Sequence, residues 1–190
     1  MEYSDLVDTI IKENKTVLDR VEKPELDRLL EEIEKAKTIQ LWSIGRLQLS
    51  VRGFAMRLKH MGFDTYVVFD TTTPCIGKGD LLIGIGAVSN VELNVIHCAK
   101  DAGATIGLLT AHPENEHGKL ADFTVCVPGQ IFGGSAEVKS IQPMASLLEQ
   151  SLLLFTDIVV MLLIERNKID IKEMHRRHTN LEGIGNAFAI

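Results

Sequence analysis

Three residue groups in this 190-residue chain have types and spacing that could do chemistry, and the first is a glycine-bearing turn. Gly84-Ile85-Gly86-Ala87-Val88-Ser89 gives a G-x-G-x-x-S pattern between an expected strand and an expected helix. Such glycines let a backbone approach a phosphate, and a dinucleotide site also needs an acid about 20 residues later. The next strand instead runs into Leu109, Thr110 and Ala111. An NAD-dependent oxidoreductase therefore remains an alternative that rests on a partial fingerprint.

The end of this turn also fits a purely structural pattern. Ser89-Asn90-Val91-Glu92 matches a capping box, in which Ser89 accepts from a helix amide and Glu92 bonds back to the cap. A Glu92 carboxylate at that helix start would occupy amides that otherwise attract a phosphate, and would add like charge.

The second group consists of single ionisable residues, of which Glu149 is the candidate general base. It is expected inside a long helix, roughly Pro143 to Glu165, beside Leu147 and Leu148. Apolar surroundings raise the pKa of a carboxyl group, which suits a base, although an ordinary polar helix position explains Glu149 equally well. His60 has two interpretations as well, because the C-terminus of a helix favours a cation whatever its function.

Histidines and cysteines form the third group. Of six histidines, His112 and His117 share one loop, and His175 and His178 are three residues apart, but neither pair has partners at zinc-ligand spacing. We therefore expect no metal site. The odd set of Cys75, Cys98 and Cys126 lacks a C-x-x-C spacing, which indicates reduced thiols and a cytoplasmic location.

Alternating strands and helices must position these groups. Apolar periodicity predicts two N-terminal helices within about residues 3–36, a sheet core within about 38–128 and C-terminal helices within about 142–180. Continuous apolar strands joined by helices predict a parallel sheet covered on both faces, which is a three-layer α/β/α sandwich. We expect a short polar connection between the strands 105–109 and 123–127, and one domain over residues 1–190.

Composition limits the partners. Lys and Arg number 20 against 26 Asp and Glu, so the net charge of −6 excludes a broadly basic nucleic-acid surface. The most apolar stretch, Leu152 to Ile164, is expected to be too short to cross a bilayer, and no signal peptide is expected. Since this stretch is apolar around most of its circumference, we expect partner subunits to cover it in a dimer or tetramer.

Several segments in the same order resemble a sugar isomerase (SIS) domain, specifically the 6-phospho-3-hexuloisomerases. The segments that carry the resemblance are Phe54-Ala55-Met56-Arg57-Leu58 with His60 and Gly62, Tyr66-Val67-Val68, Thr71-Thr72-Thr73-Pro74, Gly79-Asp80-Leu81-Leu82-Ile83, Lys119-Leu120-Ala121-Asp122, Ser140-Ile141-Gln142-Pro143-Met144 with Glu149, and Arg177-His178-Thr179-Asn180-Leu181-Glu182. The resemblance implies a five-stranded parallel sheet of flavodoxin-like type, a homotetramer and no cofactor. It also implies a carbonyl shift from C3 to C2 of a hexulose 6-phosphate through an enediol.

The resemblance further implies a site. Glu149 would be the base, His60 and His178 would approach from neighbouring subunits, and the substrate would be bound by Gly45, Arg46, Leu47, Gly86, Ala87, Val88, Ser89, Asn90, Val91 and Gln142. The sequence departs from the family at both phosphate loops. Leu47 replaces the serine of G-x-G-R-S, and Gly86, Val88 and Val91 occupy hydroxyl positions of S-G-S-G-E-T. We therefore expect an isomerase-like protein with weakened or redirected phosphate binding, or a non-catalytic protein that binds a carbohydrate derivative.

Overall fold

The structure is a computed structural model of the chain, and it describes residues 1–86 and 90–181. Five parallel strands form one sheet in the order β2-β1-β3-β4-β5. The strands are β1 (Ile39–Trp42), β2 (Thr65–Val67), β3 (Leu81–Ile85), β4 (Thr105–Thr110) and β5 (Phe123–Cys126). The strand order reverses at β1 and β3, so the loops that leave these two neighbouring strands diverge at the carboxyl edge of the sheet. A ligand site is expected at such a point.

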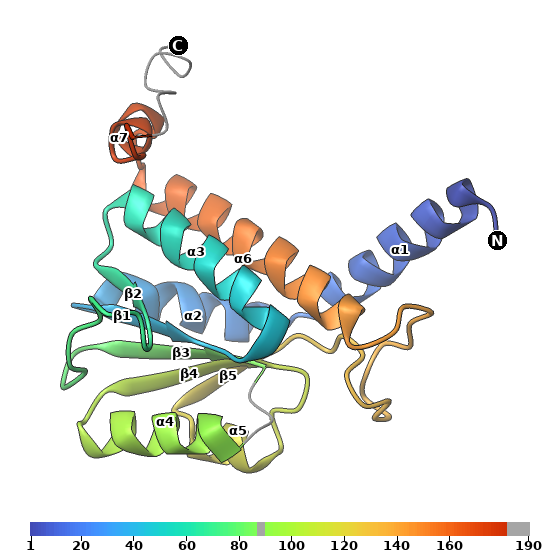
Figure 1. The fold of residues 1–190 in the computed structure, drawn as a ribbon, viewed down its shortest axis with the longest axis horizontal. Coiled ribbons are helices and arrows are strands. Elements are labelled where there is room, and N and C mark those ends of the chain that lie inside the picture. The colour runs from blue at the N-terminus through green and yellow to red at the C-terminus, as the bar shows by residue number, and fades with distance from the viewer. Residues whose placement is uncertain (87–89, 182–190) are drawn as a thin grey trace.

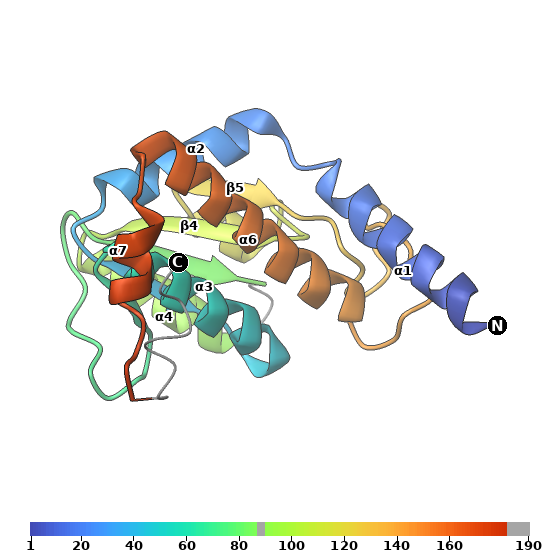
Figure 2. The same cartoon turned by 90° about the horizontal axis from the view of Figure 1, so that it is seen from above.

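Helices cover both faces, as predicted. The helices are α1 (Tyr3–Leu18), α2 (Lys23–Lys35), the 3₁₀ turn η1 (Gly45–Leu47), α3 (Gln48–Met61), α4 (Asn90–Asp101), α5 (Glu116–Leu120), α6 (Ser146–Asn167) and α7 (Ile171–Arg176). Figure 1 shows α3 and α6 on one face of the sheet and α4 and α5 on the other. Seen from above in Figure 2, α2, α6 and α3 lie side by side over the strands, and α1 extends away from this layer along the line of α6.

The sheet separates two apolar cores because successive strand residues point to opposite faces. On the α3 and α6 face, Phe54, Leu58 and Phe155 are almost completely buried. On the α4 face the core is smaller and contains Trp42, Leu82 and other buried residues of α4, β3 and β4. Both neighbouring strands of β1 pair with it in parallel register, which makes β1 central to the site described below.

Three expectations need correction. The connection between β4 and β5 contains the short helix α5, which is capped by Asn115, whose side chain accepts from the Gly118 amide. Strand β5 is only partly buried because it is an edge of the sheet. The long helix begins at Ser146 rather than at Pro143, since Met144 and Ala145 have left-handed backbone conformations with φ of 59° and 63°.

Helix α6 corrects a fourth expectation. Its 22 residues are long and apolar enough, by length and composition, to cross a membrane. However, half of the most apolar part is buried inside the protein, against α3 and the rest of its core. A core helix satisfies the same criteria of length and composition, and the burial of α6 fits that role.

Candidate functional site

Two loops meet at the carboxyl edge, where β1 and β3 end side by side. The Ser43 hydroxyl, completely buried after β1, donates to the Ile85 carbonyl of β3 at 2.6 Å. Gly86 donates its amide to the Leu109 carbonyl at 2.8 Å, and its carbonyl accepts from the Thr110 hydroxyl at 3.0 Å. These bonds fix the starts of both expected phosphate loops relative to β4.

Glu149 and Arg46 meet across this edge. Arg46, on η1, donates its Nε to Oε1 of Glu149 at 2.9 Å and its Nη2 to the Met144 carbonyl at 2.5 Å. The Ser50 hydroxyl donates to the Glu149 carbonyl, which joins the first turns of α3 and α6. The Glu149 side chain is 22% exposed and the Arg46 side chain 56%. A small anion can therefore reach the guanidinium, and a neutral carbon acid can reach the carboxylate.

The turn before α6 aims the Met144 carbonyl at Arg46. Both Met144 and Ala145 adopt φ values near 60°, where an L side chain costs roughly 1–2 kcal/mol. Two consecutive residues in this region are unusual, and strain of this kind concentrates at binding and catalytic sites. The strained turn therefore makes the start of α6 a candidate part of the site.

Helix α1 holds the segment that precedes this turn. The Glu13 carboxylate accepts from the Ser140 hydroxyl at 2.6 Å, the Ile141 amide at 2.9 Å and the Gln142 side-chain amide at 3.0 Å. Burial opposes ionisation of Glu13, but these three donors outweigh it and lower the pKa of its carboxyl. Gln142 in turn accepts from Gln150, the residue next to Glu149, at 2.7 Å. Gln142 thus lies one hydrogen bond from the neighbour of the candidate base.

The same network continues into the core. Asn14 donates to Gln150 at 2.9 Å and accepts from the completely buried Ser151 hydroxyl at 2.9 Å. Sequence reasoning missed Glu13 and Asn14, because a helix 130 residues earlier in the chain gives no local signal for such contacts. The sequence gives one sign of these contacts: Asn14 is a polar residue on the apolar side of α1, where it is only 5% exposed.

Leu47 crowds the loop that follows β3. A Cβ added at Gly86 would lie 2.6 Å from Cδ1 of Leu47, so the leucine side chain lies directly over the Gly86 backbone. Gly86 also has φ of 95°, a conformation that side chains rarely adopt. The glycine of the G-x-G pattern at position 84 has a packing role, since a Cβ there would meet the Leu108 side chain at 2.7 Å. Neither glycine therefore requires a dinucleotide to explain it.

The rest of this loop is described only in part. Ala87, Val88 and Ser89 lie outside the described residues, and with them the expected capping box and three of the expected substrate contacts. Asn90 begins α4, and Val91 follows it with 53% of its surface exposed. Glu92 is almost completely buried, at 1% exposure, rather than presented on the surface of the helix start.

His60 and His178 lie together, away from Glu149 of the same chain. Their ring centroids are 5.2 Å apart, and Arg177 donates to the His60 carbonyl at 3.1 Å. His60 comes 12 residues after the start of α3, which places it about 18 Å along the helix from η1 and Arg46. Burial first, and then the charges of His178 and Arg57, lower the pKa of His60. One chain therefore brings Arg46 to Glu149, and His60 to His178, at opposite ends of α3.

Glu137 is a second carboxylate near the site, and it accepts four hydrogen bonds. Glu137 accepts from His112 Nε2 at 2.7 Å and from the amides of Ile131, Phe132 and Gly133. Burial opposes its ionisation, but the four donors prevail and lower its pKa. We read Glu137 as the anchor of the segment between β5 and α6. His112 thus bonds to a carboxylate, and within residues 1–86 and 90–181 no group of three or more His, Cys, Asp or Glu could hold a metal ion.

The fold and this edge define a class of protein. A five-stranded parallel sheet in the order β2-β1-β3-β4-β5, with helices on both faces, is the fold of sugar isomerase (SIS) domains. A Vibrio vulnificus NanR protein solved with ManNAc-6P has the same fold, with a TM-score of 0.76 over 100% of this chain and 71% of its own, at 15% identity. No family model matches the chain.

The particular family follows from sequence relatives. The chain is 38% identical over 186 residues to the 3-hexulose-6-phosphate isomerase of Bacillus subtilis, covering 96% of this chain and 100% of that one. It is 36% identical over 163 residues to the enzyme of the same name from Methanocaldococcus jannaschii, covering 84% and 85%. A Methanococcus jannaschii crystal structure, used to infer that function, superposes with a TM-score of 0.82 at 30% identity over 93% and 99% of the chains. This chain belongs to the 3-hexulose-6-phosphate isomerase family, and its function is sugar-phosphate isomerase-like.

Proposed function

We propose that the chain isomerises a hexulose 6-phosphate by moving the carbonyl from C3 to C2. The observation that carries this proposal is the Glu149 carboxylate, partly exposed and held by Arg46 at 2.9 Å at the carboxyl edge. Glu149 removes the proton from C2 to give an enediolate, the anion of the enediol across C2 and C3. The hydroxyl proton passes from O2 to O3, and the Glu149 carboxyl returns its proton to C3. One base therefore serves both half-reactions, and no redox step is needed.

Arg46 has two roles in this scheme. In the free protein it neutralises Glu149, and when substrate binds, its exposed guanidinium contacts the phosphate. Transfer of Arg46 from the carboxylate to the phosphate leaves Glu149 free to accept a proton from carbon. Backbone amides at the start of α4 and the Gln142 side chain complete the substrate contacts.

His60 and His178 enter the site from a neighbouring copy in this proposal, because one chain places them about 18 Å along α3 from Arg46. Exposed apolar side chains on α3 and α6 support such an assembly, which we propose is a cytoplasmic homotetramer built from dimers. These side chains are Leu49, Met56, Leu153, Leu154, Ile158 and Met161. Light scattering at micromolar concentration tests the assembly, and a monomer would contradict it.

The test of the chemistry is Glu149→Gln, which keeps the shape of the side chain and removes the base. Asp157→Asn is the matched control, because Asp157 also lies on α6 and pairs with an arginine of α3 at 3.2 Å. We expect Glu149→Gln to abolish turnover and the incorporation of solvent deuterium into product, while Asp157→Asn retains both. Turnover by Glu149→Gln at the wild-type rate would assign the base to another residue.

A non-catalytic protein that binds a carbohydrate derivative is the second candidate. The observation that favours it is the Leu47 side chain over Gly86, where the family has hydroxyl groups. Binding of fructose 6-phosphate by the wild type, without exchange of its carbon-bound hydrogen in deuterated water, would select this candidate.

A further inference from the structure

Glu137 is a buried carboxylate that the proposed mechanism does not use. It lies in the segment between β5 and α6, which Figure 1 shows as a loop beside the first turn of α6. Its side chain is 1% exposed. Four donors point at it: the amides of Ile131, Phe132 and Gly133, at 3.0, 3.2 and 2.7 Å, and Nε2 of His112 at 2.7 Å. A buried charge is costly unless it is hydrogen-bonded this fully, so its presence calls for an explanation.

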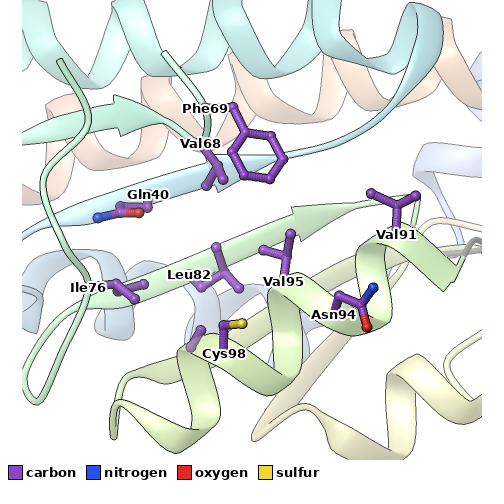
Figure 3. Close-up of a pocket in the computed structure, with 10 residues that line it drawn as sticks. Gln40, Val68, Phe69, Ile76, Leu82, Val91, Asn94, Val95 and Cys98 are labelled. Atoms are coloured by element: carbon purple, nitrogen blue, oxygen red, sulfur yellow. The ribbon is translucent and has the colours of Figure 1, made fainter. Parts of the chain in front are cut away.

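Burial also decides what kind of role Glu137 can have. A side chain that is 1% exposed does not reach a substrate, so Glu137 acts only through the groups that it holds. It does not belong to the neighbouring cavity either. Figure 3 shows this apolar cavity of about 330 Å³ between α4 and the sheet, and the residues that line it include neither Glu137 nor any of its four donors. Any functional effect of Glu137 must therefore pass through its own loop.

The Glu137 carboxylate closes the loop 129–138 from the inside. At the base of this loop, the Val138 amide donates to the Pro128 carbonyl at 2.7 Å, and Gly129 forms a parallel bridge with Val138. Glu137 comes directly before this base, and its side chain turns back to the amides of residues 131–133. One side chain therefore holds the base of the loop and its first turn together.

The base of this loop lies against the backbone of α6, one residue before Glu149. A Cβ added at Gly129 would lie 2.6 Å from Cα of Leu148 and 2.9 Å from its amide nitrogen, so the two backbones are in direct contact. Leu148 is completely buried. Helix α6 begins at Ser146, after Ala145, which makes no side-chain capping hydrogen bond. The position of the first turn of α6 therefore depends on the segments that pack against it.

We propose that Glu137 is a positioning residue for Glu149. It holds the base of the loop 129–138 against Leu148. That contact fixes the direction in which the next residue, Glu149, meets Arg46 at 2.9 Å. The inference rests on the proposed function, in which Glu149 carries a proton between two neighbouring carbons. Such a transfer needs a base held to within about 0.5 Å, and a misplacement of about 1 Å costs roughly 10²-fold in rate.

The first test is Glu137→Gln, which keeps the size of the side chain but turns one acceptor oxygen into a donor that faces backbone amides. Glu114→Gln is the matched control, because Glu114 contacts the other nitrogen of the same histidine, at 3.4 Å, with a side chain that is 71% exposed. We expect Glu137→Gln to lower kcat about 10- to 100-fold and to leave KM within about threefold, because the contacts to the phosphate do not move. Glu114→Gln should keep both constants.

A second readout does not need activity. The Nε–H group of Arg46 donates to Glu149, so its resonance in a ¹H–¹⁵N spectrum reports on that contact. Arg46→Lys identifies the resonance. We expect it to move upfield in Glu137→Gln and to stay in place in Glu114→Gln. If the wild type shows no isomerase turnover, the proposed function fails, whereas this resonance still tests whether Glu137 positions Glu149.

Gly129→Ala perturbs the same contact from the other side. The added methyl group would meet the backbone of Leu148, which has no flexible end to move aside, so the first turn of α6 must shift. Gly53→Ala is its control, because a Cβ at Gly53 makes only an ordinary contact of 3.8 Å. We expect Gly129→Ala to lower kcat and to move the Arg46 resonance, and Gly53→Ala to change neither. This pair tests the contact even where Glu137→Gln does not fold.

Three results would overturn the proposal. An Arg46 resonance that stays in place in both Glu137→Gln and Gly129→Ala would show that the loop does not position the base. A loss of kcat in Glu114→Gln equal to that in Glu137→Gln would assign the effect to the shared histidine. A rise in KM at unchanged kcat in Glu137→Gln would show that the loop supports substrate binding instead of the base.

Discussion

Replacing Leu47 by serine should strengthen the binding of a sugar phosphate. Leu47 lies over Gly86, so its side chain fills space at the phosphate loop and offers no hydrogen bond. One hydrogen bond from a hydroxyl to a charged phosphate contributes about 1.5–3 kcal/mol. At 1.36 kcal/mol per tenfold change, Leu47→Ser should lower the Kd for fructose 6-phosphate roughly 10- to 150-fold.

The cost to stability should be modest. A fully buried leucine replaced by alanine loses about 2–5 kcal/mol, but Leu47 is only half-buried, so we expect a loss of about 1–2 kcal/mol. Calorimetric titration of wild type, Leu47→Ser and Leu47→Ala at matched salt measures the gain. Leu47→Ala is the control because it removes the bulk without adding a hydroxyl. An equal gain in both variants would show that space, not hydrogen bonding, limits affinity, and no gain in either would refute the reasoning.

Gly86 should not accept the serine that the family places there. A Cβ would meet Leu47 at 2.6 Å, and φ of 95° adds backbone strain whatever lies nearby. Gly86→Ser should therefore destabilise the wild type more than it destabilises Leu47→Ala. The coupling energy in a double-mutant cycle should be about 0.5–3 kcal/mol, typical of side chains in contact. Strict additivity of the two changes in urea unfolding would contradict the contact.

Three further perturbations test the supports of the site. Glu13→Gln should reduce kcat/KM about tenfold, which is 1.36 kcal/mol, because the Gln142 segment loses a charged acceptor. Asp8→Asn, on the exposed side of α1, is the control and should leave kcat/KM unchanged. Equal kcat/KM in the wild type and Glu13→Gln would show that α1 does not support the site. Ala145→Gly should raise the free energy of unfolding by about 1 kcal/mol, or Tm by about 2–4 °C, since glycine adopts the left-handed conformation without strain. Ala121→Gly is the control: Ala121 has an ordinary φ of −72°, so this change should lower Tm. The pKa of His60 is lower in the folded chain than in the unfolded chain, so near this pKa the unfolded chain binds more protons. The free energy of unfolding should therefore be highest above about pH 6.5 and should fall as the pH drops below about 6.5. His60→Gln should flatten that slope between pH 8 and 5.5 in urea unfolding, and an unchanged slope would assign it to other groups.

The sequence by itself determined the layers of this fold. Apolar periods of 3.6 and continuous apolar strands are local properties, so residues such as Phe54, Leu58 and Ile83 already predicted the helix and strand faces that the structure buries. The sequence also indicated the family, because many short motifs occur in the family's order along the chain. That order is kept even though the two phosphate loops differ from the family pattern. Boundaries were predicted less well where the backbone leaves ordinary conformations, as at Met144 and Ala145.

Tertiary structure alone decided how the candidate site is held together. Contacts between residues about 100 positions apart, such as Arg46 with Glu149 and Glu13 with Gln142, depend on how α1, η1 and α6 pack, and no local pattern records that packing. The separation of His60 from Glu149 follows from the length of α3, and the crowding of Gly86 by Leu47 follows from the pairing of β1 with β3. The physical reason is the same in each case: a side chain's type is local, whereas its neighbours are set by the burial of faces distant in sequence.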